Sequence, residues 1–131
     1  MVEINPEKIE LDEEMARRNL DKSSVSVLEE IKYEGRVWKD LSKKYGVDNP
    51  DPPWKVTLEA TCDVLSEVAC ALPALERRWE EDELSEDHYA DVPFPERQLL
   101  ALAHSMIRRD LIDEDELKAK MKEVDKRLNM V

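Results

Sequence analysis

The amino-acid sequence predicts an all-α fold, and three observations support that prediction. The chain of 131 residues contains only two glycines, Gly35 and Gly46, so it lacks the glycines that tight β-hairpins and phosphate-binding loops require. It is rich in Glu, Lys, Leu and Ala, which favour helices. Its apolar residues recur at helical spacing and do not alternate as in a half-buried strand. We therefore expect a small helical bundle with an extended N-terminal arm.

The chain is strongly acidic. Charged residues make up 40% of the sequence and the formal net charge is -12. Such a chain repels nucleic-acid phosphates and anionic membrane surfaces, so we expect neither as a partner. No apolar run approaches the roughly 20 residues of a membrane span, and the acidic start lacks the layout of a signal peptide. We expect a cytoplasmic protein with reduced thiols.

Residues 1–48 are predicted to form an N-terminal arm and a helix. The polar residues 1–22 suit either a short helix or a flexible arm that orders on a partner. From residue 24 to residue 46 the helical period is regular, with one weak turn around Gly35. The apolar residues of this period are Leu28, Ile31, Trp38, Leu41 and Tyr45.

The ends of this second segment carry recognisable signals. Ser26 followed by Glu29 fits a capping box, and Gly46 is typical of a helix C-terminus. Residues 49–53 then form a proline-rich linker. No helix crosses this stretch, because each proline ring removes a hydrogen-bond donor and biases the preceding residue toward extended conformations.

Residues 54–131 are predicted to form the helical domain. Its first helix spans residues 54–72, with one apolar face composed of Trp54, Leu58, Cys62, Leu65, Ala69 and Leu72. Pro73 ends or kinks this helix. A shorter helical piece is expected at residues 74–84, and the densely acidic residues 80–91 are expected to form a solvated loop.

Two further helices complete the predicted domain. The first begins at Pro95, and its stripe consists of Leu99, Leu102 and Met106. In the second, Asp113 and Glu116 form a capping-box-like pair, while Ile112 and Leu117 suit a hydrophobic staple. Its apolar face steps by four, three and four residues through Leu117, Met121, Val124 and Leu128.

The two cysteines, Cys62 and Cys70, lie eight residues apart. On one helix this spacing separates them by about 80° and a rise of roughly 12 Å. They cannot share a zinc ion or form a disulfide with each other at that distance. The acidic surroundings do not favour a nucleophilic thiolate. We predict buried structural cysteines.

No other residues form a catalytic or metal-binding motif. His88 and His104 lie sixteen residues apart, outside any metal or catalytic motif. We expect His104 to pack against a helix and His88 to lie on the surface. No carboxylate pair, calcium loop or Ser-His-Asp set stands out. The sequence predicts neither a metal site nor a catalytic site of its own.

Two features are candidates for binding. Arg77 and Arg78 present rigid donor forks that recognise oxyanions, so they suit either carboxylate or oxidised-sulfur groups of a partner, or neighbouring glutamates at the surface. Aromatic residues either anchor an interface or pack in the core; they are Trp54, Trp79, Tyr89 and Phe94.

Several short segments, taken in order, resemble a known family. They are Trp54, "ATC" at 60–62, "ERR" at 76–78 and "HYADVPFPERQLLALAHSMIRRDLIDEDELKAKMKEV" at 88–124. Together they resemble the N-terminal helical part of the nitrile hydratase β subunit, and more closely the separate β subunit of thiocyanate hydrolase. The resemblance runs from about Trp54 to Arg127. It rests on ordered short motifs and includes no catalytic signature.

The resemblance implies a role beside a metal centre on another subunit. In this family, cobalt or iron is held by a Cys-x-Leu-Cys-Ser-Cys segment, which this sequence lacks. Cys62 and Cys70 would therefore not hold the metal. An arginine of the β-type subunit hydrogen-bonds the oxidised cysteine oxygens of the partner, and Arg77 or Arg78 would be its counterpart. The family's SH3-like barrel is also missing here and would be a third polypeptide.

The expected function is that of a non-catalytic β-like subunit in a cobalt-dependent nitrile hydratase, which converts a nitrile and water into an amide. The chain itself would bind no cofactor, and its partners would be the metal-bearing α-type subunit and a separate SH3-barrel subunit. Alternatives are the β subunit of thiocyanate hydrolase, an activator or metallochaperone that matures such an enzyme, and a helical interaction protein unrelated to metal chemistry.

Overall fold

The computed structural model describes residues 6–69 and 72–129. Within these ranges the chain forms seven α-helices, one π-helical turn and no strand, which confirms the all-α prediction. The elements in order are α1 (Pro6–Asn19), α2 (Ser26–Glu34), α3 (Trp38–Tyr45), α4 (Lys55–Asp63), the π-helical turn η1 (Val64–Val68), α5 (Ala74–Asp87), α6 (Glu96–Arg108) and α7 (Glu114–Leu128).

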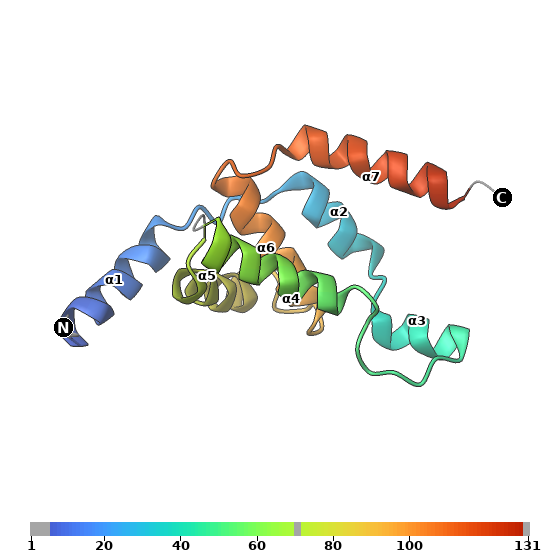
Figure 1. Ribbon diagram of the computed structural model, residues 1–131, viewed down its shortest axis with the longest axis horizontal. Helices are drawn as coiled ribbons and strands as arrows, with labels where there is room; N and C mark the ends of the chain where they lie inside the picture. The colour runs from blue at the N-terminus through green and yellow to red at the C-terminus, as the bar shows by residue number, and fades with distance from the viewer. Residues whose placement is uncertain (1–5, 70–71, 130–131) are drawn as a thin grey trace.

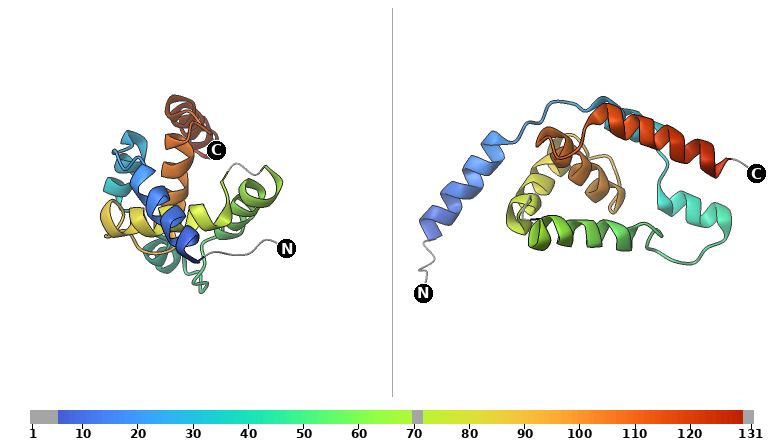
Figure 2. Two further views of the ribbon diagram at one scale, coloured as in Figure 1. Left: turned by 90° about the vertical axis from the view of Figure 1, so that its left-hand side faces the viewer. Right: turned by 45° about the horizontal axis from the view of Figure 1, so that its top comes forward.

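Helices α5 and α6 pack against each other near the centre of the molecule, whereas α3 lies apart from them toward the end where the C-terminus lies (Figure 1). Helix α1 packs on α5, and α2 packs on α6. Helices α1 and α7 extend toward opposite ends of the molecule, as the further views in Figure 2 also show. The central pair is therefore the part of the fold that positions the candidate site.

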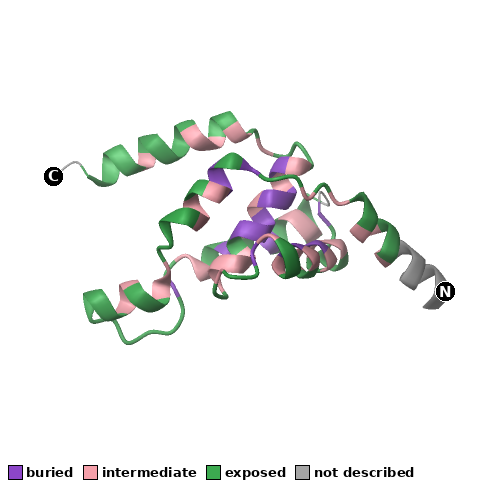
Figure 3. Ribbon diagram, turned by 180° about the vertical axis from the view of Figure 1, so that it is seen from behind, coloured by how far each residue is buried: buried purple, intermediate pink, exposed green. Residues whose placement is uncertain are grey.

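Two clusters of buried residues make up the core (Figure 3). The larger joins α2, α5, α6 and the segment between α5 and α6; its members are Val25, Val27, Leu28, Leu84, Tyr89, Leu100, Ala101 and Ile107. The smaller joins α4 to α6 and consists of Leu58, Cys62, Leu72 and Leu102. Fully burying a large aliphatic side chain stabilises a fold by roughly 1.5–3 kcal/mol, so these clusters are the main source of stability.

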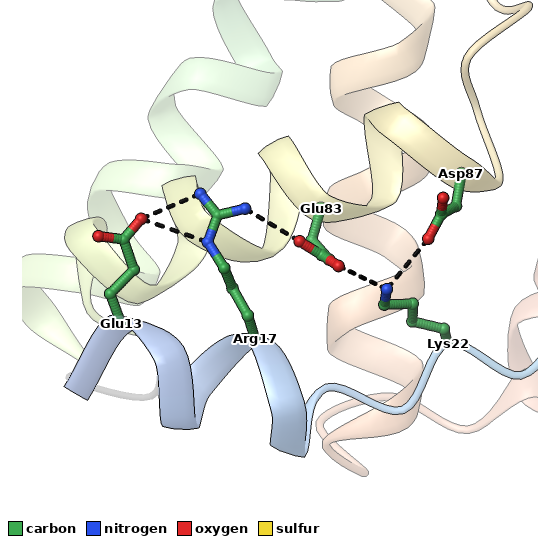
Figure 4. A network of polar contacts seen from close by, with 5 residues as sticks. All are labelled: Glu13, Arg17, Lys22, Glu83 and Asp87. Carbon is green, nitrogen blue, oxygen red and sulfur yellow. Dashed lines mark hydrogen bonds and ion pairs between the residues drawn. The ribbon is translucent and has the colours of Figure 1, made fainter. Parts of the chain in front are cut away.

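The N-terminal region is helical from Pro6 to Asn19, which agrees with the short helix expected there. Ion pairs attach it to α5 (Figure 4). Arg17 Nη1 lies 2.9 Å from Glu83 Oε2, and Lys22 Nζ lies 2.5 Å from Glu83 Oε1. Hydrogen bonds from Lys22 and Arg17 lower the pKa of the Glu83 carboxyl.

The single helix expected between residues 24 and 46 is wrong, because the structure has two helices there. Gly35 ends α2 with a left-handed φ of 64°, and Gly46 ends α3 with a φ of 69°, which confirms the stop at Gly46. The predicted capping box at Ser26 is also wrong. Val25 occupies the N-cap and is fully buried, with no side-chain cap, so burial of an apolar residue decides this helix start.

The helix predicted for residues 54–72 is regular only as far as Asp63. The π-helical turn follows, with the Ala69 amide 2.8 Å from the Val64 carbonyl oxygen. A π-helical turn holds one more residue than an α-helical turn, so Ala69 leaves the predicted apolar face and is exposed. Leu58, Cys62 and Leu72 are buried as predicted.

The loop predicted for the acidic residues 80–91 is wrong over most of its length, because α5 continues to Asp87. Glutamate favours helices, and Leu84 is fully buried against the core. Glu83 pairs with two cations from the α1 side. The acidic charge is thus compatible with a packed helix because part of it is neutralised by cations that lie far away in the sequence.

Helix α6 begins at Glu96, one residue later than predicted, with Pro95 at the N-cap. Its predicted stripe is only partly correct, since Leu99 is 40% exposed. The buried residues cover a wider sector and are Leu100, Ala101, Leu102, His104, Ser105 and Ile107. The buried face of α6 is wide because residues of α2, α4 and α5 all pack with α6 in the two core clusters. The predicted cap of α7 is confirmed, since Asp113 Oδ2 accepts a hydrogen bond from the Glu116 amide at 3.0 Å.

Candidate functional site

Arg77 and Arg78 lie side by side in the first half of α5, and their environments differ. Successive residues of an α-helix point about 100° apart. The side chain of Arg77 is 20% exposed, whereas Arg78 is exposed. Only Arg77 is therefore held in a defined position by its surroundings.

The guanidinium group of Arg77 has few hydrogen-bond acceptors. Its Nη1 lies 3.8 Å from Glu81 Oε2, which is an ion-pair distance and too long for a hydrogen bond. Its Nε is buried and has no acceptor among the residues that the structure describes. An arginine carries five N–H donors, and a buried donor without an acceptor costs free energy. Nε is thus an unpaired donor inside the chain, and the exposed fifth of the Arg77 side chain is the part that an oxyanion of a partner can reach.

The charge of Arg77 affects the pKa of Cys62 on α4. Burial raises the pKa of the Cys62 thiol, and the positive charge of Arg77 opposes this effect. Burial likewise raises the pKa of the Glu81 carboxyl. Cys62 is 4% exposed and belongs to the smaller core cluster, so the burial predicted for it is confirmed. Cys70 lies outside the described residues.

The four candidate aromatic residues have different environments. Tyr89 is fully buried, so core packing, one of its two predicted roles, describes it. Phe94 is 57% exposed. Trp54 and Trp79 are half-buried, and each lines a concave surface. Three of the four are therefore available to a partner.

Trp54 lines an apolar groove of about 380 Å³ between α2, α3 and the start of α6. Its apolar lining consists of Ile31, Val37, Trp38, Leu41, Trp54, Val92, Pro93, Leu99 and Leu100. Two hydrogen bonds fix Trp38: its amide donates to Glu96 Oε1 at 2.6 Å, and its indole Nε1 donates to the Asn49 carbonyl oxygen at 2.8 Å.

The two histidines join the core to the segment between α1 and α2. The Tyr89 hydroxyl donates to His104 Nδ1 at 2.9 Å, and His104 Nε2 donates to the Asp21 carbonyl oxygen at 2.8 Å. The carbonyl requires a proton on Nε2, which leaves Nδ1 as the acceptor of the neutral ring. Burial lowers the pKa of His104. The packing role predicted for His104 is confirmed.

His88 does not lie free on the surface, so that expectation is wrong. Its side chain is 22% exposed, and its Nε2 donates to the Lys22 carbonyl oxygen. The Nε2 atoms of both histidines are paired with backbone oxygens from a segment more than sixty residues earlier. No local sequence signal reveals such contacts.

Sequence reasoning also missed a buried ion pair. Arg109 Nε and Nη2 donate to Glu80 Oε1 at 3.1 and 2.5 Å, and the Glu80 side chain is only 6% exposed. The signal that could have found it is the spacing of Glu76, Glu80 and Leu84, which places them on one face of α5.

In residues 6–69 and 72–129, no three His, Cys, Asp or Glu side chains are grouped so that they could hold a metal ion. None of the described helices combines the length and apolarity needed to cross a membrane. What the described site offers chemically is hydrogen-bond donation from an arginine, buried carboxylates and aromatic surface.

Comparison with known proteins gives no further assignment. No family model matches the chain, and no curated protein and no solved structure matches it. The resemblance to the nitrile hydratase and thiocyanate hydrolase β subunits therefore stays a prediction that rests on the ordered motifs between Trp54 and residue 124.

Proposed function

We propose that this chain is a non-catalytic β-type helical subunit of a cobalt-dependent nitrile hydratase complex, which converts a nitrile and water into an amide. The ordered motifs suggest the family. The observation that carries the proposal at the site is the half-buried guanidinium group of Arg77, whose Nε has no acceptor among the described residues.

Arg77 would contact the oxidised cysteine oxygens of the metal-bearing partner. Charge-assisted hydrogen bonds from a planar guanidinium suit such oxygens, because two parallel donors match two oxygens. Arg77 suits this role better than Arg78, since its side chain is only 20% exposed and lies within ion-pair distance of Glu81, whereas Arg78 is exposed. A fixed donor loses less conformational entropy on binding than an exposed, mobile one.

The rest of the chain would build the wall around the partner's metal centre. The metal, held by the α-type subunit, would act as a Lewis acid toward the nitrile or water. Exposed Phe94 and half-buried Trp54 and Trp79 offer the aromatic surface that is typical of interface anchors. The SH3-like barrel would be supplied by a third chain.

The first experiment tests the assembly. The full chain is co-expressed with a subunit that carries Cys-x-Leu-Cys-Ser-Cys and with a barrel subunit, and the product is analysed by gel filtration for cobalt content and for turnover of a nitrile and of thiocyanate. A stoichiometric complex that hydrates the nitrile is the expected result. Hydrolysis of thiocyanate alone would reassign the substrate, and loss of the chain during gel filtration would favour an activator.

The second experiment tests the arginine. In the assembled complex, Arg77→Lys is expected to lower kcat by about 10²-fold, the usual effect of removing one preorganised donor, with cobalt content and assembly unchanged. Arg78→Lys is the matched control and should retain activity. Full activity in Arg77→Lys would contradict the proposal, as would an isolated chain that binds cobalt through its own thiols and hydrates a nitrile.

A further inference from the structure

A second concave site lies away from Arg77. It is a cleft of about 800 Å³ between the C-terminal half of α1, the start of α5 and the C-terminal end of α6. Its apolar lining residues are Met15, Ala16, Leu20, Pro73, Leu75 and Trp79, and its charged lining residues are Asp21, Glu76, Glu80, Arg108 and Arg109.

Glu80 is the unsatisfied group of this cleft. Its Oε1 accepts both hydrogen bonds from Arg109. Its Oε2 is buried and has no donor among the described residues. A buried carboxylate oxygen without a donor is costly, so the site lacks one donor group on the side of Glu80.

The charges around the cleft are also unbalanced. Three carboxylates and two guanidinium groups line it, which leaves one negative charge in excess. Both cations are already engaged. Arg109 Nη2 is shared between Glu80 and Glu76, at 2.5 and 3.3 Å. Arg108 Nη2 donates to two backbone carbonyl oxygens of the segment after α1, at 2.9 and 2.6 Å. One additional cation would balance the site.

The apolar wall of the cleft suits an alkyl stem. Trp79 is half-buried there, and Met15 and Leu75 are 56% and 53% exposed. An indole face attracts a cation, and long cationic side chains lie with their methylene groups along apolar surface. The wall and the carboxylate together fit a group that is cationic at its tip and apolar along its length.

We propose that this cleft binds one guanidinium or ammonium group on a short apolar stem. The tip donates to Glu80 Oε2, and the stem lies against Trp79. The terminal torsion of a glutamate side chain has a broad energy well, so the Glu80 carboxylate as a whole turns toward the cleft, and Arg109 and the bound cation share its two oxygens. The source of the cation is either a free alkylguanidine or alkylamine, or an arginine or lysine of a partner. This inference does not rest on the proposed nitrile hydratase role.

The test uses the full chain labelled with ¹⁵N and follows the Trp79 indole N–H signal, assigned with Trp79→Phe. Butylguanidinium, butylammonium and the neutral butylurea are titrated separately. A saturable shift of the Trp79 signal is expected with both cations. Butylurea should bind at least about tenfold more weakly, because it lacks the charge that strengthens the bond to the carboxylate. Equal binding of butylurea would overturn the proposal, and this comparison requires no variant.

Glu80→Gln sharpens the test. It keeps the shape of the side chain and removes the negative charge, so affinity for butylguanidinium should fall by roughly tenfold. Glu30→Gln, an exposed position on α2, is the matched control and should bind as the unaltered chain does. Unchanged affinity in a folded Glu80→Gln would contradict the proposal.

A final comparison separates the two sources of the cation. A peptide with one central arginine between alanines is titrated beside butylguanidinium. Tighter binding of the peptide indicates a side chain of a partner protein, and equal or weaker binding indicates a small free cation. Failure of both to shift the Trp79 signal would overturn the proposal, whatever the outcome of the metal-enzyme experiments.

Discussion

Helices α6 and α7 follow each other in the chain, but different interactions hold them. Six of the 13 residues of α6 are buried, whereas none of the 15 residues of α7 is buried. The capping and charge signals in the local sequence are nevertheless stronger for α7 than for α6. Helix α7 has a side-chain cap from Asp113, three acidic residues in its first turn and two basic residues in its last, whereas α6 has no side-chain cap and one residue of each kind.

This contrast shows that local signals fix the presence of a helix and not its packing. The cap and charges of α7 complement its helix dipole, and most of its apolar stripe lies outside the two core clusters. Only Leu117, together with Ile112 just before the helix, packs against the larger cluster. We expect α6 to depend on tertiary contacts and α7 on local ones.

The largest effect is expected from shortening a leucine in each helix. Leu100 of α6 is 4% exposed and Leu128 of α7 is 74% exposed. Leu100→Ala should reduce the free energy of unfolding by about 2–5 kcal/mol, and Leu128→Ala by less than about 0.5 kcal/mol. Urea denaturation measures both. Equal losses would remove the distinction between the two helices.

The next effect concerns the polar contact that joins α6 to the end of α5. Tyr89→Phe removes the hydroxyl that donates to His104 Nδ1 and leaves a buried acceptor without a partner. The expected loss is about 1–3 kcal/mol in urea denaturation. Tyr45→Phe, at a position 68% exposed on α3, is the control. A loss as small as that of Tyr45→Phe would mean that the buried contact adds nothing to stability.

A smaller effect should appear with pH. Burial lowers the pKa of His104 from its usual value of 6.5, so the unfolded chain takes up this proton first as the pH falls. The contribution of His104 to stability is therefore complete above about pH 6.5 and declines as the pH falls toward the lowered folded-state pKa. The free energy of unfolding is measured between pH 7.5 and 5.5.

His104→Gln is the reference for that measurement, because it removes the titrating ring. The difference in pH dependence between the two proteins isolates His104 from Asp21 and Glu83, whose lowered carboxyl pKa values act in a more acidic range. If both proteins show the same slope, His104 is not the group responsible.

The smallest effect on global stability is expected at the cap of α7. Asp113→Ala removes a cap of the kind that stabilises helices by about 0.5–2 kcal/mol. Because α7 carries no buried residue, the loss should be confined to that helix. Hydrogen exchange should quicken in the first turns of α7 and stay unchanged in α6. Faster exchange in α6 would show that the two helices unfold together.

The sequence predicts those parts of the fold that depend on neighbouring residues. Gly46 and Asp113 end and begin helices where expected, because glycine and aspartate act through their own backbone or the next turn. The length of α5 was missed. Its acidic residues are balanced by Arg17, Lys22 and Arg109, and no local pattern shows these pairings.

The candidate site shows the same limit. The sequence singles out Arg77 and Arg78 as a pair, but only the folded structure shows that Arg77 is the half-buried one and Arg78 the exposed one. The contact between Glu80 and Arg109 joins positions 29 residues apart. The sequence left two roles for Tyr89, packing in the core or anchoring an interface. The structure shows core packing, in which the Tyr89 hydroxyl pairs with His104 of α6.

The π-helical turn at Val64–Val68 has a consequence for length variation among related chains. It holds one residue more than the regular turns of α4 that precede it, so a chain that lacks one residue here would continue α4 as an ordinary α-helix. In an alignment of relatives, we expect a one-residue gap to be tolerated at this turn and to be disfavoured throughout α6.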